Sequence, residues 1–147
     1  MFDTDFFSRP GHLVSRAARL MARLGDERLR DLGFSVGQLP VLGSLSKGGA
    51  LPQKDLARRA HIEQPSMAQM LARMERDGII RRTPDPSDKR SSLISLSDEA
   101  RAKLPAMHEA LTQGNAETLA GLTDDEVTML KTLLQKVIAN LERITEA

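Results

Sequence analysis

The chain has 147 residues, enough for one domain with its own hydrophobic core, and it contains no cysteine. Disulfides, thiolate nucleophiles, thiol redox sensing and cysteine-ligated zinc are therefore excluded. The formal net charge of +1 hides a basic centre, because residues 47–92 hold ten Lys and Arg against six Asp and Glu, whereas residues 93–147 hold five against nine. A basic centre suits a protein that meets phosphate, although ordinary solvated helix faces would explain the charges equally well.

The sequence shows no sign of export or membrane insertion. Residues 1–7 carry acids where a secretory signal would carry cations. The longest uncharged stretch, residues 32–46, is too short and too rich in Gly, Ser and Gln to span a bilayer. We therefore expect a soluble cytoplasmic protein.

The first part of the chain predicts an extended arm and a long helix. The arm contains Pro10 and Gly11, and apolar residues then recur at helical spacing from residue 13 to about residue 32. Gly33 is a plausible stop for this helix.

Three further helices are predicted next, and the last two are closely spaced. Ser35 and Gln38 form a capping box for a helix over residues 36–45. A short helix over residues 53–60 is followed, after a tight connection, by a longer helix over residues 63–77. Short helices joined by so few residues are the helix-turn-helix pattern.

A hairpin is predicted directly after this pattern. Gly78 ends the preceding helix, and β-prone runs at residues 79–83 and 91–96 flank the turn-forming residues 84–88. We therefore expect a hairpin with a long tip. A helix followed at once by a charged hairpin is typical of a module that places the helix in the major groove of DNA and the hairpin beside it as a wing.

Two helices complete the chain. Ser97, followed by two acids, caps a long helix that Pro105 should bend, and Thr123 with Glu126 forms a capping box for a last helix. One side of the last helix is an apolar stripe: Val127, Leu130, Leu133, Leu134, Val137, Leu141 and Ile144. The stripe needs a covering surface, either on a partner chain or inside a helical bundle.

The helix over residues 63–77 offers a polar face that can read bases. Pro65, Ser66, Gln69 and Arg73 share the side opposite its apolar residues. Gln pairs with adenine in bidentate fashion, Arg takes guanine or a phosphate, Ser bonds at a base edge, and Pro can touch a thymine methyl. A generic polar helix face is common, so this pattern alone is a weak signal.

The predicted wing carries four cations, Arg81, Arg82, Lys89 and Arg90, which a purely structural hairpin would not need. Asp88 can accept a hydrogen bond from the Arg90 guanidinium and hold it for insertion into a narrow minor groove. A solvated loop is the alternative, and the helix ahead of the wing favours DNA. Candidates for phosphate contacts lie in the preceding helix: Lys54, Arg58 and Arg59.

Three stretches of the sequence resemble the MarR family of winged-helix transcription regulators, most closely its SlyA-like members: IEQPS, RDGIIRR and PDPSDKRSSLISLS. The resemblance covers nearly the whole chain. Its most specific mark is the pattern Asp, any residue, Arg in the wing, which here is formed by Asp88 and Arg90. It implies that Pro65, Ser66 and Gln69 read the major groove and that Arg90 enters the minor groove. Gln69 replaces the Arg of SlyA-like proteins, so the preferred DNA sequence cannot be copied across.

The resemblance also implies a fold class and a homodimer. The fold would be mainly α with a small β-hairpin wing, namely a winged helix-turn-helix lobe over about residues 33–97 between dimerisation helices over about residues 1–32 and 98–147. A palindromic operator needs two lobes about 34 to 36 Å apart, which favours a dimer over a closed bundle. Besides the stripe of the last helix, the expected interface includes Phe2, Phe6 and Phe7.

Members of this family commonly bind small aromatic acids or phenolic compounds, which loosen their hold on DNA. In this sequence His12 and Arg16 lie one turn apart and could pair with a carboxylate, although an exposed polar face explains both at least as well. No cofactor is expected. Without cysteine the chain cannot sense peroxide as some relatives do.

Catalysis and metal binding are not expected. His12, His61 and His108 are scattered, and Gly43 to Gly48 breaks the spacing of a phosphate loop. Our hypothesis is a homodimeric, sequence-specific transcription regulator, a repressor that occupies a promoter palindrome and is released by a small aromatic ligand. The alternative is a helical adapter that uses a winged-helix scaffold to hold another protein.

Overall fold

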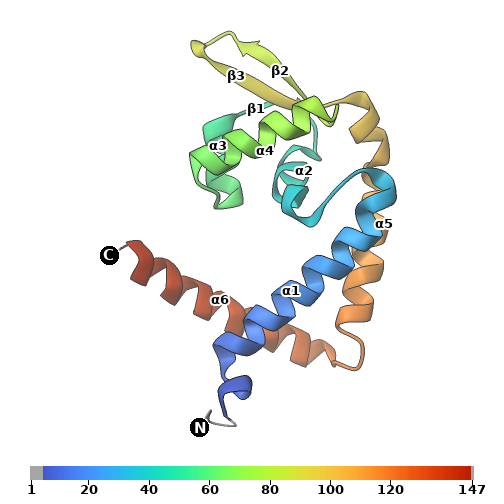
Figure 1. Cartoon of the computed structure of the whole chain (residues 1–147), viewed down its shortest axis with the longest axis vertical. Coiled ribbons are helices and arrows are strands. Elements are labelled where there is room, and N and C mark those ends of the chain that lie inside the picture. The colour runs from blue at the N-terminus through green and yellow to red at the C-terminus, as the bar shows by residue number, and fades with distance from the viewer. Residues whose placement is uncertain (1–4, 147) are drawn as a thin grey trace. The chain divides into compact units, whose positions relative to one another are not determined.

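The computed structural model describes residues 5–146, so Phe2 lies outside the described residues (Figure 1). The described chain is mainly helical, with one small sheet, as predicted. Its elements are η1 (Phe6–Ser8), α1 (Pro10–Leu29), η2 (Arg30–Leu32), η3 (Val36–Gln38), α2 (Leu39–Leu45), β1 (Leu51–Pro52), α3 (Gln53–Ala60), α4 (Gln64–Arg76), β2 (Ile80–Asp85), β3 (Asp88–Leu96), α5 (Asp98–Thr118) and α6 (Asp124–Glu146). No described helix is long and apolar enough to cross a membrane.

The chain forms two compact units, the first ending at Thr112 and the second beginning at Gln113. The first unit holds every element from η1 to β3 and most of α5, and the second holds the end of α5 and all of α6. The division into one lobe and two sets of dimerisation helices stays a prediction.

The core of the first unit lies where α2, α3 and α4 meet the sheet. Each of these helices turns one apolar side inward, at the helical spacing visible in the sequence. Fully buried members of the core are Leu42, Leu45, Leu56, Met67, Leu71, Met74 and Ile94. The core therefore fixes how α4 is rotated about its own axis.

The sheet has three antiparallel strands in the order β1-β3-β2. Leu51 of β1 lies opposite Ile94, and Ile80 of β2 lies opposite Leu96. The sequence interpretation missed β1, because a strand of two residues, one of them Pro52, has no alternating pattern. β1 joins the segment before α3 to the base of the wing.

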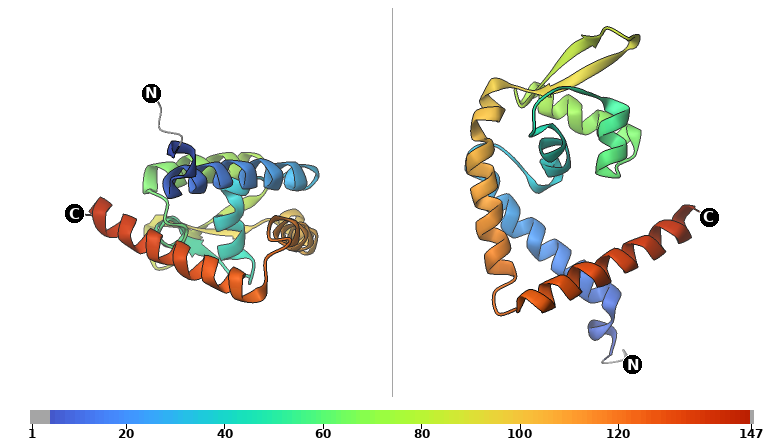
Figure 2. Two further views of the ribbon diagram at one scale, coloured as in Figure 1. Left: turned by 90° about the horizontal axis from the view of Figure 1, so that it is seen from below. Right: turned by 180° about the vertical axis from the view of Figure 1, so that it is seen from behind.

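The wing is a longer hairpin with a shorter tip than predicted. Its strands run to Asp85 and from Asp88, and only Pro86 and Ser87 form the turn. Asp85 accepts hydrogen bonds from the Ser87 backbone N–H (2.9 Å) and hydroxyl (2.7 Å), and these local bonds let turn-forming residues close the hairpin tightly. In Figure 2 the hairpin extends past α3 and α4, so its turn lies away from the core.

The prediction of an extended arm through Pro10 and Gly11 was wrong. Pro10 is the first residue of α1, where its missing N–H costs nothing because the first N–H groups of a helix have no partner inside it. Phe6 to Ser8 form a short 3-10 helix before it. Gly33 has a left-handed backbone (φ 76°) and ends η2, as the predicted stop requires.

The predicted helix caps are confirmed. The Gln38 side chain accepts a hydrogen bond from the Ser35 N–H (3.1 Å), although the helix expected there begins as the 3-10 turn η3. Ser97 accepts from the Ala100 N–H (3.1 Å) at the start of α5, and α5 continues through Pro105. The capping box before α6 has both of its hydrogen bonds, between Thr123 and Glu126.

α1 joins the winged lobe through a close contact at Gly25. A β-carbon at this position would overlap the Cγ2 atom of Val36, so only glycine lets the two segments approach this closely. The next residue, Asp26, accepts a hydrogen bond from the Val36 N–H (2.8 Å). A second hydrogen bond near the end of α1 comes from α5: Lys103 donates to the Leu32 carbonyl (3.1 Å).

We expect Gly25→Ala to lower the free energy of unfolding by about 1 to 2 kcal/mol. Overpacking costs about 1 to 3 kcal/mol, and the better helix propensity of Ala offsets up to about 1 of that. The control is Gly43→Ala in α2, where an added β-carbon has no neighbour within 4 Å and should be neutral or stabilising. Urea unfolding at one protein concentration measures both, and equal stabilities would contradict the contact.

Candidate nucleic-acid interface

The exposed side of α4 carries the four residues predicted to read bases. Pro65, Ser66, Gln69 and Arg73 are all exposed. The opposite side of α4 is anchored in the core through Met67, Leu71 and Met74, each 0% exposed. The predicted polar face is therefore held outward by burial of the apolar face.

A tight turn sets the position of α4 relative to α3. His61 takes a left-handed backbone (φ 54°), and Ile62 donates its N–H to the Ala57 carbonyl (3.0 Å). Across the turn the Gln53 side-chain amide donates to the Gln64 side chain (3.0 Å). Sequence reasoning found the connection but not the conformation of His61, because the left-handed region is uncommon for residues other than Gly.

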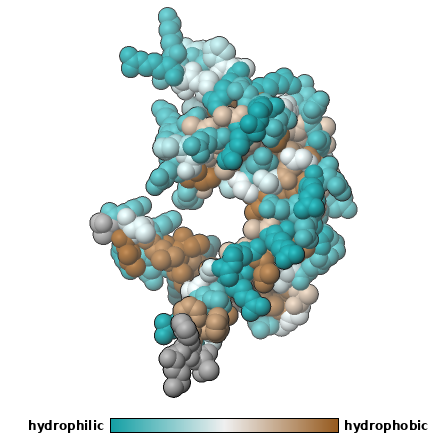
Figure 3. All heavy atoms as spheres, in the orientation of Figure 1, coloured by the Kyte–Doolittle hydropathy of each residue, from teal (hydrophilic) through white to brown (hydrophobic). Residues whose placement is uncertain are grey.

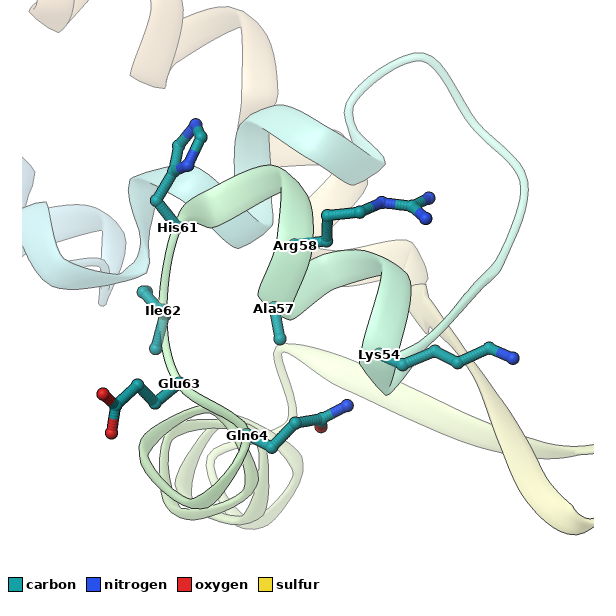
Figure 4. Close-up of a pocket in the computed structure, with 7 residues that line it drawn as sticks. All are labelled: Lys54, Ala57, Arg58, His61, Ile62, Glu63 and Gln64. Carbon is teal, nitrogen blue, oxygen red and sulfur yellow. The ribbon is translucent and has the colours of Figure 1, made fainter. Parts of the chain in front are cut away.

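A shallow pocket lies along this turn (Figure 4). The side chains of Lys54 and Arg58 extend to the same side as the Gln64 amide, whereas Glu63 points to the opposite side. Arg58 also lies 3.5 Å from Asp55. Two cations beside the N-terminus of a helix form an arrangement that suits a phosphate of a DNA backbone. The pocket is lined by Lys54, Ala57, Arg58, His61, Ile62, Glu63 and Gln64.

Near the wing tip, Lys89 and Arg90 are exposed on β3, directly after the two-residue turn. Asp88 has a different partner from the predicted one: its carboxylate accepts the backbone N–H of Arg90 (2.9 Å), and no contact with the guanidinium is found among the described residues. A bond to the backbone shapes the strand after the turn rather than holding the Arg90 side chain.

The two cations at the base of the wing have acidic partners. An Arg81 guanidinium nitrogen lies 2.9 Å from Asp98 at the start of α5, and Arg82 Nε lies 3.4 Å from Glu75 in the last turn of α4. Sequence reasoning missed both acids, because partners from separate elements have no local spacing that would pair them. DNA contact by Arg81 and Arg82 stays a prediction, and such a contact would compete with these two ion pairs.

The residues suggested for an effector lie on α1. The His12 ring packs against Phe6 and Phe7, with ring centroids 5.7 and 5.2 Å apart, while Arg16 is exposed. The structure therefore gives His12 a packing role that the sequence had not indicated. In residues 5–146 no group of three or more His, Asp or Glu is placed to hold a metal ion.

Apolar side chains of α6 are exposed within the second unit. Leu133 is 50% exposed, Val137 43% and Leu141 53%, whereas Leu134 is half-buried. Figure 3 shows apolar residues gathered along this helix. In the first unit, Phe6 and Phe7 are also exposed, at 44% and 63%. Exposed apolar side chains gathered in this way are typical of a surface that binds another molecule.

Comparison with known proteins agrees with this geometry. The model of the MarR family matches residues 34–92, which run from the start of the helix-turn-helix region to the wing. This match gives residues 34–92 a likeness to the MarR family. It is 29% identical over 115 residues to YwoH, an HTH-type transcriptional regulator of Bacillus subtilis, covering 78% of this chain and 83% of that protein.

Two solved structures extend the MarR-family likeness to nearly the full chain. A mutant MarR of Escherichia coli in complex with operator DNA superposes with a TM-score of 0.82 at 28% identity, covering 92% of this chain and 98% of the other. BpsR of Bordetella bronchiseptica, whose DNA binding is regulated by 6-hydroxynicotinic acid, superposes with a TM-score of 0.80 at 26% identity, covering 90% and 94%.

The wing tip has one carboxyl with a perturbed pKa, that of Asp85. The Ser87 hydroxyl and backbone N–H both donate to Asp85 and hold the pKa of Asp85 below its usual value of 3.8. Because the folded pKa is depressed, the stabilisation of the turn is complete above the unfolded pKa and is lost as pH falls through the folded pKa.

We therefore expect the backbone amide resonance of Ser87 to titrate with a midpoint below 3.8 in an NMR pH series. In Ser87→Ala the hydroxyl bond, which is the largest cause, is gone, so the Asp85 carboxyl should titrate closer to its usual value. Identical midpoints in the two proteins would show that the hydroxyl does not hold the carboxylate.

Proposed function

We propose that this chain is a homodimeric, sequence-specific DNA-binding transcription regulator that represses by occupying promoter palindromes. The observation that carries the proposal is the exposed polar face of α4, followed after one tight turn by a hairpin with Lys89 and Arg90 near its tip. A related MarR with the same fold binds operator DNA. The match of residues 34–92 to the MarR family model supports this function over a protein-binding adapter.

Each proposed contact follows from the chemistry of the side chain. Gln69 and Arg73 would pair with base edges in the major groove, and one good bidentate contact contributes about 1 to 3 kcal/mol of base discrimination. Lys54 and Arg58 would hold backbone phosphates and so position the protein without reading sequence. Arg90 would enter the minor groove beside the wing. Smaller contributions to the interface would come from Pro65, Ser66, Asp88 and Lys89.

The homodimer would be built from the exposed apolar residues of α6 together with Phe6 and Phe7. Burial of apolar surface drives such association, at roughly 25 cal/mol for each Å² removed from water. Two copies related by a twofold axis present their α4 helices to successive major grooves, as a palindrome requires. The proposed interface residues on α6 are Leu130, Leu133, Leu134, Val137 and Leu141.

We also propose that a small aromatic acid releases the protein from DNA. Regulation of BpsR by 6-hydroxynicotinic acid supports an effector of this class. His12 and Arg16 remain the proposed carboxylate partners, although His12 already packs against two phenylalanine rings. To change DNA occupancy from 99:1 to 1:99, such a ligand must prefer one conformation by about 5.5 kcal/mol. A cytoplasmic location, where promoters are accessible, is part of the same proposal.

The test of the proposed function begins with duplexes selected from randomised DNA by the full-length protein. Arg90→Ala should bind the selected duplex more weakly. The slope of log affinity against log salt concentration should be smaller by about one for each wing, because a cation that binds close to phosphates releases counterions from the DNA. The control is Arg30→Ala, which removes the same charge from η2, outside the proposed interface. Failure to select any duplex at low salt would reject the function, and an unchanged slope in Arg90→Ala would reject the wing contact.

The proposed dimer makes a separate prediction. Leu133→Asp should give a monomer in light scattering at micromolar concentration and should lose binding to a selected palindrome, because a charge buried in the interface lacks a partner. Gln135→Asp, which adds the same charge on the opposite side of α6, should leave the dimer intact. A wild-type protein that is already monomeric at high concentration would refute the interface.

A further inference from the structure

The base of the wing is held by acids on both of its faces. Arg81 and Arg82 are neighbours in β2, and successive side chains of a strand point to opposite faces of the sheet. One face accordingly pairs Arg81 with Asp98 of α5, and the other pairs Arg82 with Glu75 of α4. The wing is thereby linked to the groove-reading helix by one ion pair and to α5 by the other.

The two ion pairs differ in how far water reaches them. The side chains of Arg81 and Asp98 are 55% and 91% exposed, so solvent and salt screen their attraction. Arg82 and Glu75 are 28% and 46% exposed. Arg82 also stands opposite Ile94, which is 0% exposed, so its backbone is anchored in the core. The pair between Arg82 and Glu75 is the better placed to fix geometry.

We propose that Glu75 and Arg82 are positioning residues that set the wing against the last turn of α4. The connection between them is short: Gly78 takes a left-handed backbone (φ 76°), and Ile79 donates its N–H to the Met74 carbonyl (2.9 Å). The ion pair closes this turn and so fixes the direction in which the hairpin leaves α4.

The proposal rests on the proposed function and gives Arg82 a role different from a phosphate contact. A phosphate contact by Arg82 would make Glu75 a competitor, so Glu75→Gln would free the cation and strengthen binding. A positioning pair predicts that loss of either charge misplaces the wing relative to the bases that α4 reads. The two roles therefore predict different results for Glu75→Gln: stronger binding to every duplex if Arg82 contacts phosphate, and weaker discrimination between DNA sequences if the pair positions the wing.

The experiment compares Glu75→Gln, Arg82→Gln and the double variant in the full-length protein. Fluorescence anisotropy measures affinity for a duplex selected by the wild-type protein and for a scrambled duplex of equal length. The readout is the ratio of the two affinities, because a change in net charge acts on both duplexes alike and cancels in the ratio. Thermal unfolding of each variant shows whether it is folded at the assay temperature.

We expect each single change to lower the ratio by about two- to fivefold, the range for an ion pair of this exposure, and the double variant to be no worse than either. The swapped pair Glu75→Arg with Arg82→Glu should restore most of the ratio. Arg76→Gln, the matched control, removes the same charge from the last turn of α4, where Arg76 lies 3.6 Å from Asp77, and should leave the ratio unchanged.

Three results would overturn the proposal. They are an unchanged or higher ratio in Glu75→Gln, additive losses in the double variant, and an equal loss of the ratio in Arg76→Gln. A smaller salt slope in Arg82→Gln, together with stronger binding by Glu75→Gln, would assign Arg82 to a phosphate instead. If the wild-type protein bound no duplex, the proposed function would fail first, and thermal unfolding would still measure the coupling between the two side chains.

Discussion

Burial of one side of α4 is the constraint on which the interface depends. Met67, Leu71 and Met74 are completely buried, and burying each such side chain contributes about 1.5 to 3 kcal/mol. Each residue of a helix is turned by about 100° from the one before, so rotating α4 by one residue would bring polar groups into the core. The side that carries Gln69 and Arg73 has no alternative orientation. The outward orientation that the proposed reading of DNA requires is therefore a consequence of core packing.

The cations of the basic centre have two roles in the structure: some form ion pairs with acids of other elements, and others are exposed to solvent. Arg81 and Arg82 have acidic partners on separate helices, whereas Lys89 and Arg90 are exposed beside the wing turn. A count of cations over residues 47–92 does not separate these roles, because paired and unpaired guanidinium groups look alike in a sequence. The Coulomb attraction of the paired groups is local, and that of the exposed groups extends over about 10 Å at 0.1 M salt.

The sequence predicted the helices and the outward face of α4 because both follow from short-range periodicity. Three capping motifs, at Ser35, Ser97 and Thr123, were confirmed because a cap is a hydrogen bond between residues three apart. β1 and the partners of Arg81 and Arg82 could not be predicted, since they depend on segments that meet only after folding. The arm at Pro10 was misjudged because Pro suits both an extended segment and the first turn of a helix.

The two-residue turn at the wing tip is flanked by two acids and two cations, Asp85, Asp88, Lys89 and Arg90. Pro84, Asp85 and Asp88 are turn-forming residues, yet the structure places them in strands, and a bulge occurs between Pro84 and Asp85. The carboxylates of Asp85 and Asp88 each accept a backbone N–H two residues further on, so they are engaged within the turn. Lys89 and Arg90 follow Asp88 on β3, in a stretch for which the register gives no partner in β2. The acids thus restrain the turn by local hydrogen bonds, and a restrained turn would lose less conformational entropy in the proposed contact of its cations with DNA.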